Sequence, residues 1–270
     1  MLPHDADPPQ TARKPRRTSR WVRWSGGFVV LFMLMLLGPL SLLALGNETQ
    51  RGPWWSAKRE SSGQAPSPAA EPQAVVQVYA ARLIGWRGAF GVHTWVATKP
   101  AGADAYTVHH VIGWRHYRGR SPVVTQRGTP DFYWFGAYPQ KLVDIRGAQA
   151  GALIGRIEQA VTDYPYADRY AAWPGPNSNT FTAFIGRQVP ELGLDLPPTA
   201  IGKDFLGNFT LFAPTPSGSG WQFSLFGILG LSLSRIEGVE VNLFGLAAGL
   251  DWSDPALRLP GLGKIPGPDS

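Results

Sequence analysis

The chain has 270 residues, which is enough for one domain of ordinary size together with a terminal extension. Only 16% of the residues are charged, while 32 glycines and 25 prolines favour short elements joined by turns over a helical bundle. The sequence contains no cysteine, so disulfides, cysteine-ligated zinc and a thiol nucleophile are all excluded.

The net charge of +6 is concentrated ahead of residue 25. Six basic and two acidic side chains precede that residue, whereas the remaining 246 residues carry 19 basic and 17 acidic side chains. A nearly neutral body lacks the basic surface that nucleic-acid binding requires. We therefore expect no nucleic-acid partner, and we interpret the basic excess as a signal of membrane topology.

An uncharged, strongly apolar run begins at Ser25 and ends at Gly46. As a helix rising about 1.5 Å per residue, it is long enough for the roughly 30 Å hydrocarbon core of a bilayer. We predict a basic cytoplasmic tail over residues 1–24 and a retained transmembrane anchor over residues 25–46. Because basic residues precede the run, the rest of the chain is expected on the extracytoplasmic side of the cell inner membrane, as in a single-pass protein.

A cleaved signal peptide is the alternative for this segment. Ala44-Leu45-Gly46 resembles the small-x-small pattern of a cleavage site. The run is longer than the roughly 7–15 residues of a typical signal-peptide core, which favours the retained anchor.

Beyond the anchor, the sequence pattern divides the chain into three parts. Residues 47–73 are rich in Pro, Ser and Gly without periodicity and are expected to form a flexible linker. Residues 74–262 are expected to form the globular domain, and the Pro- and Gly-rich residues 263–270 a loose C-terminal tail. β-Branched and aromatic residues predict the first strands of the domain at 74–82, 89–98 and 106–117.

Helical periodicity replaces strand alternation after residue 146. Leu153, Ile154 and Ile157 fall on one face of a helix expected over residues 147–163. A stiff Trp173-Pro174-Gly175-Pro176 segment leads to a second, shorter helix, and a hairpin of residues 222–234 and 239–246 follows. This order predicts an α+β domain with an antiparallel sheet and two or three helices behind the N-terminal transmembrane helix.

The polar stretch that follows Pro176 carries the first candidate for chemistry. Ser178 is expected to open the second helix, where free backbone N–H groups and the helix dipole would assist a nucleophile. Its neighbours Asn177 and Asn179, together with Trp173 before the stretch, are candidate binding residues. Ser and Asn are also favoured N-caps for purely local reasons, so a capping role is the alternative for this stretch.

A histidine on the second predicted strand is the candidate general base. Strand alternation places His93 on the same face as Gly91, Trp95 and Ala97, which makes Trp95 a further candidate binding residue. A satisfied buried histidine is the alternative for His93. His109, on the next strand, would approach His93 if the two strands form a hairpin, and it is the candidate third catalytic group.

The five histidines match no zinc-site spacing, so no metal site is predicted. No Gly-rich phosphate loop stands between a predicted strand and a predicted helix. We therefore expect neither a bound metal nor a cofactor.

Four stretches of the sequence carry a resemblance to a known family. They are residues 86–95 (WRGAFGVHTW), 163–166 (DYPY), 173–181 (WPGPNSNTF) and 194–203 (LDLPPTAIGK). These stretches resemble a bacterial family known as domain of unknown function 3750 (DUF3750), and the resemblance covers roughly residues 74–262. It brings no established activity with it.

The order of the candidate residues is also similar to that in the circularly permuted papain-like hydrolases of the NlpC/P60 type. There a cysteine opens a helix and a histidine on an early strand is its base, so His93 matches the histidine and Ser178 the cysteine. Serine at a thiol position weakens such chemistry because its pKa lies far above that of a thiol. The resemblance therefore implies a permuted papain-like fold with a degenerate site.

Three functions follow as hypotheses. The first is a non-catalytic, degenerate papain-like domain of the cell envelope that binds a wall peptide, a lipid or a partner protein. The second is a serine amidase or acyl hydrolase that acts on wall peptide or lipid through Ser178 and His93. The third is a structural scaffold of the envelope. A pocket that joins Ser178 to His93 would favour the first two hypotheses over the third.

Overall fold

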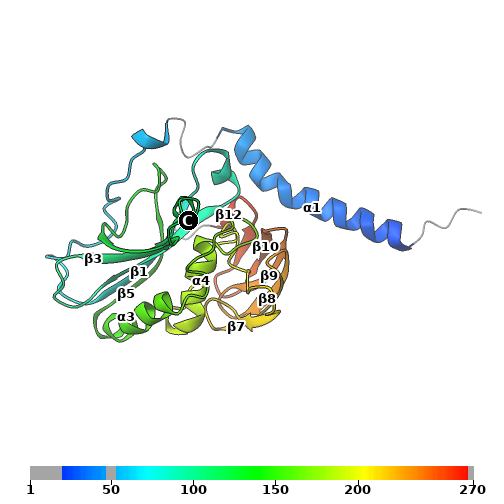
Figure 1. The fold of residues 1–270 in the computed structure, drawn as a ribbon. Helices are drawn as coiled ribbons and strands as arrows, with labels where there is room; N and C mark the ends of the chain where they lie inside the picture. Colours follow the sequence, from blue (N-terminus) through cyan, green and yellow to red (C-terminus); the bar gives the residue numbers. More distant parts are fainter. Residues whose placement is uncertain (1–19, 47–52, 267–270) are drawn as a thin grey trace, which may run out of the picture. The chain divides into compact units, whose positions relative to one another are not determined.

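The computed structural model describes residues 20–46 and 53–266 (Figure 1). Most of the predicted basic tail, the first six residues of the predicted linker and the last four residues of the chain lie outside this range. The described chain contains four α-helices and two antiparallel sheets, which confirms the predicted α+β class.

The N-terminal apolar run forms a single helix, α1 (Arg20–Ala44). Within it, Ser25–Ala44 is long and apolar enough to cross a membrane. The predicted N-terminal apolar helix is therefore confirmed, with Pro39 tolerated near its C-terminal end.

The first sheet has five strands in the order β4-β3-β2-β1-β5, and all neighbours are antiparallel. Valine, threonine and aromatic residues dominate its central strands, as β propensity requires. The strands are β1 (Val75–Arg82), β2 (Val92–Lys99), β3 (Tyr106–Val111), β4 (Val123–Gly128) and β5 (Gln140–Arg146).

Two of the predicted strands are shorter than expected. The strand expected over residues 89–98 begins at Val92, because the 3₁₀ helix η2 (Gly85–Ala89) precedes it. The strand expected over residues 106–117 ends at Val111, and the short helix α2 (Gly113–His116) follows. A Cβ at Gly113 would lie 2.3 Å from the Tyr170 ring, so glycine is what lets the chain turn there.

The five-stranded sheet is covered on both faces. On its helix face, Val76, Val78 and Val96 pack against α3 and α4. On its loop face, Val75, Tyr79 and Trp95 pack against the loop that contains Phe132, Trp134 and Ala137. Because successive strand residues point to opposite faces, neighbouring residues of β2 enter different cores.

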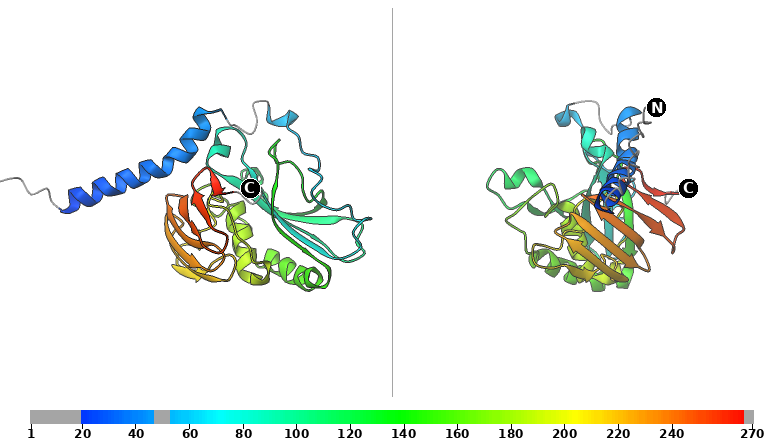
Figure 2. Two further views of the ribbon diagram at one scale, coloured as in Figure 1. Left: turned by 180° about the vertical axis from the view of Figure 1, so that it is seen from behind. Right: turned by 90° about the vertical axis from the view of Figure 1, so that its right-hand side faces the viewer.

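The two main helices confirm the predicted helical segments. They are α3 (Gly147–Thr162), whose buried residues include Leu153, Ile154 and Ile157, and α4 (Ser178–Gln188). The 3₁₀ helix η3 (Pro190–Leu192) follows α4. In the ribbon views, α4 lies between the five-stranded sheet and the second sheet (Figures 1 and 2).

The second sheet has seven strands that follow one another in sequence order. The expected hairpin is present as β8 and β9, but residues 222–234 form two strands instead of one. The chain reverses at Phe226-Gly227, where both residues have positive φ. The strands are β6 (Phe212–Pro214), β7 (Gly220–Leu225), β8 (Leu229–Ser234), β9 (Gly238–Leu243), β10 (Leu246–Asp251), β11 (Ala256–Leu259) and β12 (Gly263–Ile265).

The segment ahead of β1 is tied to the domain by a buried carboxylate. Asp131 accepts hydrogen bonds from the hydroxyls of Ser61 and Ser62 and from the backbone N–H groups of Gln64 and Ala65. The short helix η1 (Trp54–Ser56) precedes these contacts. Residues 61–65 are thus fixed against the loop that covers the five-stranded sheet.

Candidate functional site

The start of α4 is organised by Asn177 rather than by Ser178. The Asn177 side chain accepts hydrogen bonds from the backbone N–H groups of Asn179 and Thr180, at 2.9 and 3.1 Å. In return, the Thr180 hydroxyl accepts the Asn177 backbone N–H at 3.1 Å, which completes a capping box. Ser178 is the first residue of the helix and does not cap it.

The two asparagines of this stretch bind backbone groups of the chain itself. The Asn177 amide donates to the carbonyls of Ala172 and Ile201, and the Asn179 amide donates to those of Val92 and Ile201. Both side chains are buried. In this structure they hold α4 to β2 and to the segment around Ile201.

Ser178 and His93 lie on opposite faces of the five-stranded sheet. Thr94 donates a hydrogen bond to the Ser178 carbonyl at 3.2 Å, so Thr94 faces α4. His93 is the neighbour of Thr94 on the same strand and therefore points to the loop face. The expectation that His93 faces Ser178 is wrong, because sequence alternation does not reveal which face of β2 the helix covers.

His93 belongs to a buried aromatic cluster on the loop face. Its ring stacks on Trp134 with centroids 3.7 Å apart, and its Nε2 lies 3.3 Å from Nδ1 of His110. Burial, and secondly the charge of His110, holds the pKa of His93 well below its ordinary value. Burial also lowers the pKa of His110 to about 4, so both rings are neutral at pH 7.

His109 lies on the other face of the sheet, since it is paired with Val96 of β2. Its Nδ1 lies 3.0 Å from the Thr125 hydroxyl and its Nε2 lies 3.4 Å from that of Thr98. Burial lowers the pKa of His109 to about 4. It is His110, and not His109, that approaches His93, and the hydrogen bonds of the described chain join none of Ser178, His93 and His109 to another.

The two predicted binding tryptophans occupy different settings. Trp95 is fully buried, stacks on Tyr79 and Phe132, and donates its indole N–H to the Pro130 carbonyl at 2.7 Å. Trp173 is half-exposed, and its indole N–H donates to the Phe244 carbonyl at 3.0 Å. Only Trp173 is therefore open to a ligand.

A cavity of about 350 Å³ opens where the end of β1 meets β12. Its size falls in the range of small-ligand sites. We call it the Arg82 cavity; its lining combines apolar walls with a few charged groups: Ala80, Ala81, Arg82, Val92, Tyr138, Gln140, Leu142, Asp195, Pro197, Thr199, Arg258, Leu262, Gly263 and Lys264.

Arg82 is the one unneutralised cation of this lining in the part of the chain that the structure describes. Its guanidinium donates to the Gly88 carbonyl at 3.1 Å, and no carboxylate of the described residues lies within ion-pair distance. Burial lowers the pKa of Arg82, so its charge is partly desolvated in the cavity wall. An anion entering the cavity would supply an ion-pair partner.

Residues 73–205 match the family model described as "Protein of unknown function (DUF3750)". No curated protein and no solved structure matches the chain. The DUF3750 segment supplies the five-stranded sheet, α3, α4 and most of the cavity lining, whereas β6–β12 follow it in the sequence. The resemblance to papain-like hydrolases stays a prediction.

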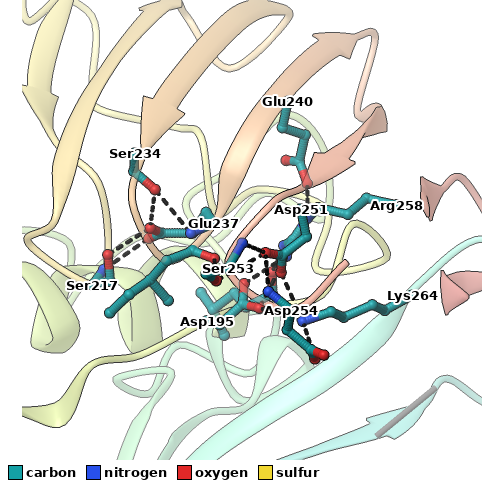
Figure 3. Close-up of polar contacts among 12 residues, drawn as sticks. Asp195, Ser217, Ser234, Glu237, Glu240, Asp251, Ser253, Asp254, Arg258 and Lys264 are labelled. Carbon is teal, nitrogen blue, oxygen red and sulfur yellow. Dashed lines mark hydrogen bonds and ion pairs between the residues drawn. The ribbon is translucent and has the colours of Figure 1, made fainter. Parts of the chain in front are cut away.

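A buried ion network joins the DUF3750 segment to the second sheet (Figure 3). Arg258, fully buried on β11, forms ion pairs with Asp195 at 2.8 Å and with Glu240 at 2.9 Å. Lys203 pairs with the other oxygen of Glu240. Although burial opposes the charge of Arg258, these two carboxylates outweigh it and raise the Arg258 pKa.

Lys264 is likewise neutralised at the mouth of the network. It lies 2.7 Å from Asp251 and 2.9 Å from Asp254, as Figure 3 shows. Arg258 and Lys264 therefore already have carboxylate partners. Arg82 is the cation of the cavity lining that is left to bind an anion. Sequence reasoning missed Arg258 and Lys264; the signal was one charged residue within each of two short, otherwise uncharged strands.

Proposed function

We propose that this is a membrane-anchored protein of the cell envelope whose extracytoplasmic domain binds an anionic small ligand in the Arg82 cavity. The observation that carries the proposal is Arg82 itself: a partly buried guanidinium, without a carboxylate partner among the described residues, in the wall of a 350 Å³ cavity. The apolar run Ser25–Ala44 supports the membrane anchor. The one-sided basic tail supports the extracytoplasmic placement.

The lining favours an anion that carries a small apolar part. A carboxylate or phosphate would form charge-assisted hydrogen bonds with the guanidinium, which are about twice as strong as neutral ones. Val92, Leu142 and Leu262 offer an apolar wall beside it. The free carboxyl end of a wall peptide has this chemistry and is the ligand class that we propose.

The geometry offers no comparable support for the serine hydrolase hypothesis. A nucleophilic serine needs its base within about 3 Å, or slightly further away without substrate. His93 stacks on Trp134 on the loop face, while Ser178 lies at the helix face. We therefore propose binding without catalysis.

Calorimetry on the full chain in lipid nanodiscs tests this proposal. The probes are a short peptide with a free C-terminal carboxylate, the same peptide amidated at its C-terminus, and inorganic phosphate. Loss of one charge-assisted hydrogen bond, worth roughly 1.5–3 kcal/mol, predicts binding about tenfold or more weaker for the amidated peptide. Displacement of the peptide by phosphate would identify the ligand as a phosphate-bearing anion.

The matched variants are Arg82→Gln and Arg127→Gln. Arg127 lies on the exposed edge strand β4, pairs with Asp104 and is not part of the cavity lining. Arg127→Gln should therefore leave the affinity unchanged. Arg82→Gln should lower the affinity to the level of the amidated peptide. Equal affinity of Arg82→Gln and the native chain for the carboxylate peptide would refute the proposal.

A further inference from the structure

The seven-stranded sheet points apolar side chains outward and polar side chains inward. Directly opposed residues of antiparallel strands lie on one face, so the strand register defines rows across the sheet. One row crosses all seven strands: Pro214, Trp221, Leu233, Val239, Leu250, Leu257 and Ile265. A second crosses β6–β10: Phe212, Phe223, Leu231, Val241 and Ala248.

These two rows form the outer face. None of their residues is buried; Trp221 is 67% exposed, Leu233 59% and Leu250 54%. No member is charged, and none offers a side-chain hydrogen bond except the indole of Trp221. Seven strands about 4.8 Å apart carry this apolar surface over about 29 Å. Soluble monomers rarely expose so continuous an apolar face.

Contacts on the inner face stabilise a sheet whose polar side chains point inward and whose apolar side chains point outward. The row between the two outer rows contains Gln222, Ser232, Glu240 and Arg258, and all four side chains are buried. Gln222 accepts a hydrogen bond from Arg187 of α4 at 2.9 Å. Glu240 and Arg258 belong to the buried ion network. Gln222, Glu240 and Arg258 therefore bind groups within the domain, and the apolar rows are left for a partner outside it.

Two hairpin turns, one between β7 and β8 and one between β9 and β10, contain a phenylalanine in a strained conformation. Phe226 and Phe244 have φ of 55° and each precedes a glycine, a turn position that ordinarily favours asparagine. Both side chains are about two-fifths exposed.

We propose that the outer face rests on the lipid bilayer in which α1 is anchored, with the two apolar rows in contact with acyl chains. A protein partner is recognised through about one hydrogen bond per 100–200 Å² of interface, and the side chains of these rows supply almost none. Acyl chains require none. The chain itself carries a helix apolar enough to cross a membrane, so the bilayer is present at high effective concentration. This inference shares the membrane anchor with the proposed function and does not depend on ligand binding in the Arg82 cavity.

Site-directed spin labelling of the full chain in nanodiscs tests this contact. The sequence has no cysteine, so one introduced cysteine gives one labelled site. The test positions are Leu231→Cys on β8 and Leu250→Cys on β10, and the matched control is Gln126→Cys on the exposed strand β4. Collision with lipid-soluble oxygen should exceed collision with a water-soluble nickel complex at both test positions. The order should be reversed at Gln126→Cys.

Every other result overturns the proposal. Nickel accessibility at Leu231→Cys and Leu250→Cys as high as at the control would show that the face lies in water. Spin–spin broadening that disappears on dilution with unlabelled chain would identify a second copy as the occupant. Protection from both collision agents would identify another protein. Resistance of each variant to alkaline extraction reports the α1 anchor separately, so loss of face contact is distinguished from loss of anchoring.

A charged variant supplies a second measurement with the label at Leu231→Cys. Leu250→Glu alters an exposed side chain, so the fold should be retained. Combined with Leu231→Cys, it should raise nickel accessibility at the label without changing extraction resistance. Unchanged accessibility in this double variant would also contradict contact with lipid.

Discussion

His93, His109 and His110 are held neutral by burial in the five-stranded sheet. In the unfolded chain these side chains take up protons near their ordinary pKa of 6.5, whereas His109 and His110 in the folded chain do so only near 4. The unfolded state therefore binds more protons between these values. Stability is complete above pH 6.5 and falls as the pH drops toward 4.

This asymmetry predicts acid sensitivity of the domain. Each buried histidine should lower the free energy of unfolding by up to about 1.4 kcal/mol per pH unit across that window. Thermal melting of His109→Gln should show a shallower pH dependence, because the variant lacks one titrating ring. The fold should be retained, because the glutamine amide can still bond to Thr98 and Thr125. His116→Gln alters a side chain outside the buried set and is the control. A melting temperature that is constant from pH 7 to 5 would contradict the assignment.

Asn177 and Ser178 form a second matched pair at the residue scale. Asn177→Ala removes the helix cap and leaves the carbonyl of Ala172 without the donor that Asn177 supplies, so we expect a loss of about 2–4 kcal/mol. Ser178→Ala removes a hydroxyl that caps nothing and should change stability by less than about 0.5 kcal/mol. Urea unfolding of the two variants measures the difference. Equal losses would contradict the assignment of the cap to Asn177 alone.

The sequence pattern predicted which residues share one face of a strand better than it predicted which residues meet in the folded chain. Alternation correctly placed His93 with Trp95 on one face of β2. It could not tell which face α4 would cover, because both faces of this strand are buried and carry similar residues. The Arg82 cavity was missed for a related reason: Arg82, Leu142 and Leu262 are distant in sequence and meet only in the folded chain.

At the scale of elements, the junction between the DUF3750 segment and the second sheet depends on Arg258. Arg258→Met would leave the buried Glu240 and the partly buried Asp195 without this cation, so we expect a loss of about 3–5 kcal/mol. Lys264→Met should cost less, because Asp254 is exposed to water and the buried Asp251 keeps its hydrogen bonds from Ser253 and from the backbone N–H of Asp254. Denaturant midpoints of the two variants test this order, and a reversed order would contradict it.

Element types were predictable where the hydrophobic period was clear, and boundaries were not. The 3.6-residue spacing of Leu153, Ile154 and Ile157 gave α3 almost to its ends. The continuous apolar stretch 222–234 concealed a turn, because Phe226-Gly227 lacks the polar residue that usually marks one. The period of two also says nothing about which face of a strand is buried, so the inverted second sheet was beyond prediction.

At the scale of the whole molecule, α1 and the basic tail predict the topology. A periplasmic reporter fused after Ala57 should be active, and a cytoplasmic reporter at the same position should be inactive. The charge control replaces Arg16, Arg17 and Arg20 with glutamate, which should reduce the periplasmic signal. Activity of the cytoplasmic reporter alone would reverse the orientation.

Retention of the anchor is a separate expectation. The mature chain should begin upstream of Ser25, because the apolar run exceeds the length of a signal-peptide core. N-terminal sequencing of the purified protein measures this directly. A mature N-terminus at Asn47 would show that the run is removed and that any membrane contact must come from the domain.

The sequence separation between Asp195 and its partners Arg258 and Lys264 has a consequence for biosynthesis. Asp195 lies in the DUF3750 segment, yet both of its cationic partners are synthesised more than sixty residues later. Until those residues emerge, the emerging polypeptide carries a carboxylate that cannot be buried favourably. The domain should therefore complete its folding only after Lys264 has left the ribosome, and a chaperone that shields nascent segments would act on it during that interval.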